Sequence, residues 1–159
     1  MEPHAESSPH GVSGATFQLL GRHRVAVTDD LIWLVAMGGL DLPETVQLTD
    51  LCYQVADRYG YTLVLVDARH AEPASPESRR YQIGRLKQRI VPSHSAIYGA
   101  NVVVTTFISL YHRAVEILLK KAPPASYHKD EAAARARLAA ERENLRRQSA
   151  PSGSSTSQR

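Results

Sequence analysis

Three side chains able to exchange protons or to hold an anion lie within four residues of one another, directly after a run of apolar residues. Asp67, Arg69 and His70 follow the stretch from Thr62 to Val66. An acid that orients an imidazole can support proton transfer, so Asp67 with His70 is a candidate acid/base pair. Alternation along a strand points Asp67 and Arg69 to the same side, and a structural ion pair is the competing interpretation. The sequence shows no nucleophile for this group, and we therefore expect no enzymatic activity.

The run before these residues predicts a strand buried on both faces of a sheet, because Leu and Val fill consecutive positions after a break at Gly60. In open α/β sheets, ligands bind just beyond the carboxyl ends of the strands. We therefore predict that this run is the central strand. Asp67, Arg69 and His70 then stand where a functional site would lie, and a loop is expected from His70 to Ala74.

The rest of the chain alternates strand and helix patterns. Further strands are predicted at residues 17–20, 22–28, 31–37, 95–98 and 125–128, of which the first three form a β-meander. Helices are predicted to begin after the N-caps Asp41, Ser75, Asn101 and Asp130. This order predicts an α/β fold with a central, mainly parallel sheet of about five strands and about four helices packed against it.

The helix after Asn101 is the most apolar of the four. Its apolar stripe has helical spacing and is wide enough to predict a well-buried helix. The stripe consists of Val103, Phe107, Leu110, Tyr111, Ala114 and Leu118. Because polar residues interrupt the stretch 102–119, we expect it to fall short of a membrane span.

The composition predicts one domain, over residues 15–147, between two arms. Residues 1–14 and the Ser-rich residues 148–159 have too little apolar surface to offset the entropy of ordering, and we expect both arms to be disordered. The single cysteine, Cys52, suits a reducing compartment. The N-terminus lacks the basic start and apolar core of a secretory signal, so a cytoplasmic protein is expected.

Charge is distributed unevenly along the chain. Residues 1–78 contain four Lys/Arg against eleven Asp/Glu, whereas residues 79–159 contain fifteen against five. The basic half could meet an anionic partner, or the two halves could neutralise each other in the fold. No aromatic residues interleave with the arginines and no reading motif is present, so nucleic acid is not an expected partner.

Metal and cofactor sites are not predicted. The seven histidines never fall at i, i+3 or i, i+4 spacing within one helix, and Cys52 has no Cys or His neighbour. The glycines form neither a phosphate-cradling loop nor a dinucleotide fingerprint.

The order of the elements, together with several short motifs, resembles the STAS-like superfamily, the fold of anti-sigma-factor antagonists and of the cytosolic domains of sulfate transporters. The likeness is closer to the bacterial stand-alone STAS/SEC14-like proteins and spans residues 17 to about 145. It is carried by Trp33 with Gly38-Gly39, Asp41-Leu42-Pro43-Glu44, Leu65-Val66-Asp67-Ala68-Arg69, Ser75-Pro76-Glu77, Ile97-Tyr98-Gly99-Ala100 and Ser126-Tyr127-His128 before Asp130-Glu131-Ala132.

The resemblance implies a regulatory role. In the antagonist branch, a partner kinase phosphorylates a serine at the start of the helix after the central strand, and this controls binding to the partner. Ser75 or Ser78 would occupy that place here, with Ser75 the expected phosphoacceptor. A phosphate on Ser75 would lie at a helix N-terminus with Arg79 and Arg80 one turn away. A plain N-cap is the alternative role of Ser75.

We therefore expect a non-catalytic regulatory or protein-binding module of the STAS-like type with a protein partner. The predicted surface for a partner or a small anionic ligand comprises Asp67, Arg69, His70, Ser75, Ser78, Arg79 and Arg80. One alternative is a small carrier of lipids or anionic ligands of the SEC14-like type, although close packing would fill its apolar pocket. A second alternative is an enzyme that uses Asp67 and His70.

Overall fold

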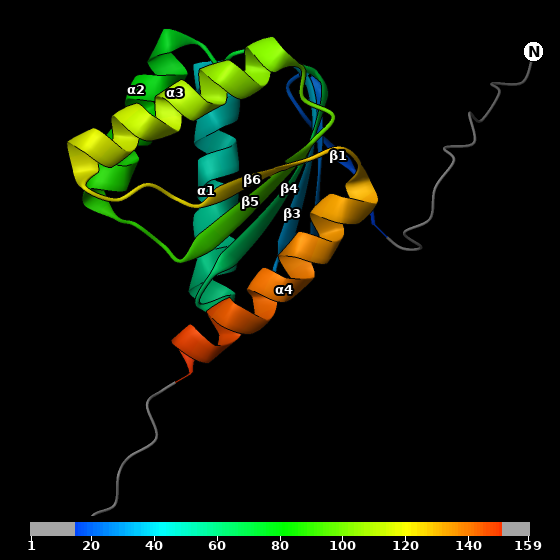
Figure 1. The fold of residues 1–159 in the computed structure, drawn as a ribbon, viewed down its shortest axis with the longest axis vertical. Coiled ribbons are helices and arrows are strands. Elements are labelled where there is room, and N and C mark those ends of the chain that lie inside the picture. Colours follow the sequence, from blue (N-terminus) through cyan, green and yellow to red (C-terminus); the bar gives the residue numbers. More distant parts are fainter. Residues whose placement is uncertain (1–14, 151–159) are drawn as a thin grey trace, which may run out of the picture.

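A mixed sheet of six strands forms the centre of the structure, a computed structural model that describes residues 15–150 (Figure 1). The predicted order of strands and helices is confirmed, with six strands rather than about five. The predicted arm 1–14 and residues 151–159 of the predicted tail lie outside the described residues. The strands are β1 (Gln18–Leu20), β2 (His23–Thr28), β3 (Leu31–Gly38), β4 (Thr62–Ala71), β5 (Ser93–Tyr98) and β6 (Ala125–His128). The helices are α1 (Leu42–Tyr59), α2 (Pro76–Gln88), α3 (Val102–Leu119) and α4 (Glu131–Ser149).

The strands follow one another across the sheet in chain order. The first three form the predicted antiparallel meander, and β3, β4, β5 and β6 pair in parallel. The sheet is therefore mixed, with a parallel half and an antiparallel half. The four parallel strands end at one edge, and every helix begins there after the predicted cap, so this edge combines strand carboxyl ends with helix N-termini.

Strand β4 extends farther than predicted. We expected a loop from His70, but β4 continues through Ala71. A β-bulge accompanies the extra length. Val35 pairs with Asp67 and Met37 pairs with His70, so β4 has one more residue than β3 between these two pairs. The pairing with β3 then resumes, which keeps these residues in the sheet instead of in a loop.

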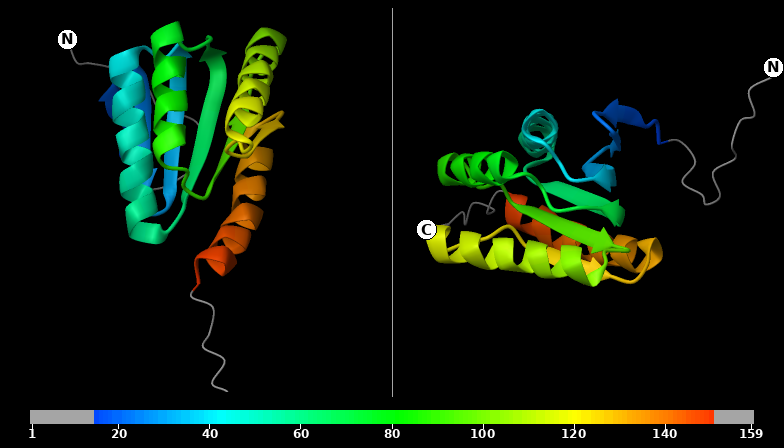
Figure 2. Two further views of the ribbon diagram at one scale, coloured as in Figure 1. Left: turned by 90° about the vertical axis from the view of Figure 1, so that its left-hand side faces the viewer. Right: turned by 90° about the horizontal axis from the view of Figure 1, so that it is seen from above.

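Helices cover both faces of the sheet (Figure 2). Helices α1 and α2 lie on one face, and α4 crosses the other. Each face of the sheet has a hydrophobic core, and side chains of β4 contribute to both. Leu63 and Leu65 pack toward α4, whereas Val66 packs toward α1. The strand is thus buried on both sides, as its continuous apolar run predicted.

A buried acidic residue connects α4 to the opposite end of the sheet. Asp30, in the turn between β2 and β3, accepts two hydrogen bonds of 2.8 Å from the Arg142 guanidinium and one of 2.6 Å from the Tyr61 hydroxyl. Arg146 donates to that hydroxyl at 3.1 Å. Burial alone would raise the pKa of Asp30, but these hydrogen bonds outweigh it and hold the pKa below its usual value. This network fixes the second half of α4 against two turns of the sheet.

Arg142→Met is expected to lower the free energy of unfolding by about 3 kcal/mol at neutral pH, because it leaves the Asp30 carboxylate buried without its main partner. Since the folded pKa of Asp30 is lowered, its contribution in the wild type is present above the unfolded pKa of about 3.9 and is lost as the pH falls through the folded pKa. The difference between variant and wild type should therefore shrink toward acid pH, as urea unfolding can measure. Arg137→Met, which removes only an i,i+4 pair with Glu141, should cost about 0.5 kcal/mol. Equal losses for the two variants would contradict this role of Asp30.

Helix α3 is not buried as predicted. Only Val104 and Val115 of its residues are buried, whereas Val103, Leu110 and Leu118 of the predicted core stripe are 60–68% exposed. The cause is its position beside α2, near the β5–β6 end of the sheet, where no other element of residues 15–150 covers its outer side (Figures 1 and 2). Within residues 15–150, α3 alone is long and apolar enough to cross a membrane, by length and composition only. Here it is the connection between two paired strands.

Candidate functional site

The predicted acid/base pair does not form. Asp67 is buried and faces α4, where Arg69 donates to its carboxylate from Nε at 3.0 Å and from Nη2 at 2.6 Å. Burial alone would raise the pKa of Asp67, but the hydrogen bonds from Arg69 outweigh it and lower the pKa below its usual range. His70 is exposed beyond the bulge, and no hydrogen bond joins it to Asp67 in the described residues. This geometry is that of a structural ion pair.

The position of Arg69 depends on Gly99. Gly99 has a φ of +72°, and a Cβ built on it would lie 2.4 Å from Cγ of Arg69. A side chain here would therefore both strain the backbone and displace the arginine. The Ile97-Tyr98-Gly99 turn thus supports the ion pair.

Ser75 and Ser78 form the N-terminal cap of α2. The Ser75 hydroxyl accepts the backbone N–H of Ser78 at 3.2 Å and lies 2.9 Å from the Ser78 hydroxyl. Ser78 is buried and donates to the carbonyl of Leu40 at 3.0 Å, whereas Ser75 is half-buried. Ser75 is therefore the more accessible of the two hydroxyls. The pair also ties α2 to the loop after β3.

The predicted surface is divided by the sheet. Asp67 and Arg69 face α4, whereas Ser75 and Ser78 lie at the start of α2 on the other side. Along α2, Arg79 turns inward and Arg80 is exposed. The structure therefore groups Arg79 with residues that sequence reasoning did not assign to a site.

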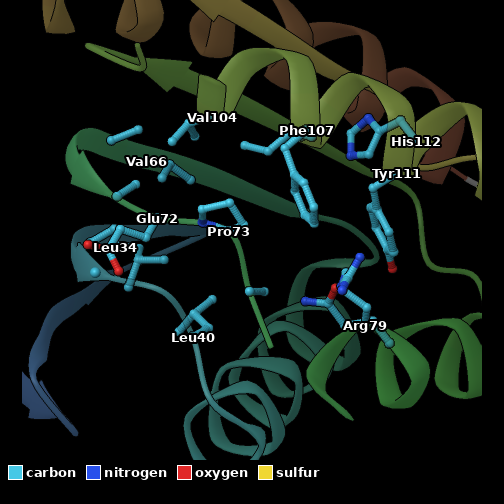
Figure 3. Close-up of a pocket in the computed structure, with 17 residues that line it drawn as sticks. Leu34, Leu40, Val66, Glu72, Pro73, Arg79, Val104, Phe107, Tyr111 and His112 are labelled. Atoms are coloured by element: carbon cyan, nitrogen blue, oxygen red, sulfur yellow. The ribbon is translucent and has the colours of Figure 1, made fainter. Parts of the chain in front are cut away.

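Arg79 borders an apolar cleft between the sheet, α2 and α3, which we name the α2–α3 cleft (Figure 3). Its volume is about 200 Å³. The lining from the sheet and the loops includes Leu34, Ala36, Leu40, Val66, Ala68, Glu72 and Pro73, and the lining from α2 and α3 includes Arg79, Gln82, Val104, Phe107, Ile108, Tyr111 and His112. Figure 3 shows Phe107 and Tyr111 projecting from α3 toward Arg79.

Polar groups gather at one end of the cleft. The Arg79 guanidinium lies 4.8 Å from the centre of the Phe107 ring, a cation–π distance. Its Nε atom and the Tyr111 hydroxyl are buried and have no hydrogen-bond partner among the described residues. Burial raises the pKa of Tyr111 to about 12 and lowers that of His112, so both are neutral at pH 7. Arg79 is thus the one charged group at this end.

Sequence reasoning placed the apolar residues of α3 in a core and missed their role as a cleft wall. Phe107 and Tyr111 stand one turn apart beside Val104 and Ile108, a spacing that is the same for a core face and for a cavity wall. The available signal was the partly aromatic and hydroxyl-bearing character of this face. Only its distance from the sheet distinguishes the two cases.

A second polar cluster combines a serine with two histidines. Ser126 Oγ lies 2.9 Å from Nε2 of His94 and 2.8 Å from Nε2 of His128. This is the separation of a nucleophile and a base. His94 is buried beside α4, on the face opposite the α2–α3 cleft, and burial lowers its pKa. None of the three residues lines that cleft, and they connect β6 with β5.

Cys52 and His23 are two further side chains with reactive groups. Burial raises the pKa of the Cys52 thiol to about 12, so it is protonated at pH 7 and a poor nucleophile. Within residues 15–150, no three His, Cys, Asp or Glu residues are placed to hold a metal ion. His23 is buried, accepts the Met37 N–H at 2.9 Å and contacts Glu44 at 3.1 Å, which secures the start of α1.

Within residues 15–150, five of the six large apolar side chains that are exposed on helices belong to α3. We define the outer face of α3 as the five large apolar residues of this helix that are 60–81% exposed. They are Val102, Val103, Leu110, Ile117 and Leu118. Arg113, Lys120 and Lys121 are exposed on or beside it, against Glu116 as the acidic residue of the helix. Clusters of exposed apolar residues of this kind mark interaction surfaces.

Ser75→Ala is expected to lower the free energy of unfolding by about 1 kcal/mol, because the Ser78 N–H loses its capping oxygen. Ser75→Asp keeps an oxygen acceptor at the helix start and should retain nearly the wild-type stability. Urea unfolding of the three proteins measures both effects. A Ser75→Ala protein as stable as the wild type would show that the cap contributes nothing.

Comparison with protein-family models, curated proteins and solved structures finds no match for this chain. The functional inference therefore depends on the two features of α3, the cleft on its inner side and the apolar face on its outer side.

Proposed function

We propose that this protein is a non-catalytic, protein-binding regulatory module of the STAS-like type and that its partner docks on the outer face of α3. The observation that carries the proposal is the exposure of large apolar side chains along this helix, from 60% at Leu118 to 81% at Val102. The strand and helix order and the short motifs that resemble the STAS-like superfamily support the module type. The paired state of Asp67 with Arg69 supports a non-catalytic role.

The energetics favour a partner with an apolar groove. Removing a Leu or Ile side chain from water is favourable by about 1.5 kcal/mol or more, and α3 exposes three such residues, Leu110, Ile117 and Leu118. Leu110 and Ile117 are seven residues apart and Ala114 lies between them, which is the spacing of anchors in helix-in-groove recognition. Only part of this burial would appear as affinity, because association and side-chain ordering oppose it.

The positive charges beside this face indicate which residues should border the groove of the partner. Arg113 lies among the apolar residues of the outer face, and Lys120 and Lys121 follow the end of the helix. A groove with acidic residues at its rim would complement them, which favours correct orientation and faster encounter. We therefore infer a partner protein that presents an apolar groove with a negatively charged border.

Substitution of the outer face tests this proposal. Leu110→Glu with Ile117→Glu should abolish partner binding and change the free energy of unfolding by no more than about 0.5 kcal/mol, because both side chains are more than 60% exposed. The matched control is Leu19→Glu, which places the same charge on another side chain that is 77% exposed, on β1. Affinity purification from the native cells, followed by binding measurements with the purified partner, compares the variants.

The proposal predicts a partner that is lost with the α3 variant and kept with the Leu19 variant. Partner binding that survives the α3 substitutions would overturn it. So would sedimentation showing that this face only joins two copies of the chain, or association with lipid vesicles in place of a protein.

We further infer that Ser75, and not Ser78, is the phosphoacceptor of this module. Ser75 is half-buried and Ser78 is fully buried, so the Ser75 hydroxyl is the more accessible of the two to a kinase. A phosphate on Ser75 would replace the 2.9 Å contact between the Ser75 and Ser78 hydroxyls. It would place a dianion at the N-terminus of α2, where the helix dipole stabilises negative charge. Phosphopeptide mass spectrometry of protein from native cells should find phosphate on Ser75 and none in Ser75→Ala. Phosphate on Ser78 instead would contradict the assignment.

A further inference from the structure

The α2–α3 cleft has one end that is prepared for an anion. Arg79 forms no ion pair with a carboxylate of residues 15–150, and its buried Nε atom has no hydrogen-bond acceptor among them; its guanidinium contacts the Phe107 ring. The hydroxyl of Tyr111 is likewise buried without a partner, and Figure 3 shows it pointing toward Arg79. Buried donors without acceptors are costly, at about 1–3 kcal/mol each. An acceptor bound at this end of the cleft would satisfy both groups.

The charges around the cleft favour a single negative group at this end. His112 is neutral at pH 7 because burial lowers its pKa, and Gln82 adds an uncharged amide. The one carboxylate of the lining, Glu72, lies across the cleft from Arg79, beside Leu34 (Figure 3). An anion next to Arg79 would thus meet a cation and neutral hydrogen-bond donors.

Away from Arg79, the side chains that line the cleft are apolar apart from Glu72. Figure 3 shows Val66, Pro73 and Val104 there, with the Glu72 carboxylate beside Leu34, and the lining also includes Ala68 and Ile108. Val66, Ala68, Pro73, Val104 and Ile108 offer no side-chain hydrogen bonds, so an apolar body suits this part of the cleft. The volume of about 200 Å³ is below the usual range of about 300–1,000 Å³ for sites of drug-sized ligands. The space suits one short chain or one ring and excludes a diacyl lipid in this conformation.

The geometry points to a binding site for a small amphipathic carboxylic acid, with its carboxylate between Arg79 and Tyr111 and its apolar body between the sheet and the inner side of α3. A carboxylate accepts two hydrogen bonds from a guanidinium in a fixed geometry and can accept a third from a phenol. The site and the proposed partner surface use different residues, because none of the five residues that define the outer face of α3 lines the cleft.

Octanoate is a suitable probe, and octan-1-ol is its uncharged counterpart of similar length. Titration of the full chain, followed by calorimetry and by methyl chemical shifts of Val104 and Ile108, should show saturable binding of octanoate. Binding of octan-1-ol should be at least about tenfold weaker, because it cannot form charge-assisted hydrogen bonds with Arg79.

Two pairs of variants make the test specific. Arg79→Gln should weaken octanoate binding about tenfold or more and leave octan-1-ol binding unchanged, whereas Arg80→Gln, at the exposed neighbouring position, should change neither. Ile108→Trp should fill the apolar end and remove binding of both probes. Leu110→Trp, on the outer face of the same helix, should bind both probes like the wild type.

Equal affinities for octanoate and octan-1-ol would overturn the site, as would wild-type octanoate binding by Arg79→Gln or by Ile108→Trp. Circular dichroism and thermal unfolding of each variant confirm that it is folded. These outcomes are separate from those of the partner test. Arg79 of α2 and Ile108 of α3 line the cleft, whereas the residues changed in the partner test, Leu110, Ile117 and Leu19, do not.

Discussion

The need to cover both faces of β4 determines the arrangement of the rest of the molecule. Four apolar residues from Leu63 to Val66 alternate between the two faces, so each face must be shielded from water. Helices α1 and α2 shield one face and α4 shields the other, and the Asp30–Arg142 contact holds α4 in place. With both faces already covered by three helices, α3 remains at the side of the sheet. Its exposure is a consequence of this coverage.

The position of α3 produces two chemically different surfaces from one apolar helix. Its inner side stands far enough from the sheet to leave the α2–α3 cleft, with Arg79 and Tyr111 at one end. Its outer face carries apolar side chains, with cations on or beside it, that stay exposed in the part of the chain that the structure describes. A helix packed closely on the sheet would have eliminated both. The loose packing of one connection is therefore the structural basis of both proposed interactions.

Alternation along β4 also explains why the residues first expected to act together are separated. Asp67 and Arg69 share one side and pair with each other beneath α4. The bulge carries His70 away from them, and Ser75 and Arg79 follow on the opposite side of the sheet. Proximity in sequence thus brought the charged residues to the same edge, but not into one site. Of the predicted surface residues, Arg79 is the one that lines the α2–α3 cleft.

The sequence by itself determined the order of the elements, the meander, the helix caps and the double burial of β4, because each depends on local propensity, turn chemistry or periodicity. Asp41, Ser75, Asn101 and Asp130 all cap helices as predicted. Only the tertiary structure decided what covers each apolar face. A stripe such as Val103, Leu110 and Leu118 indicates that a helix side is apolar, but the number of helices that a sheet can accommodate decides whether that side is buried, lines a cleft or meets a partner. The length of β4 and its bulge were likewise set by pairing with β3, a contact between residues far apart in the chain.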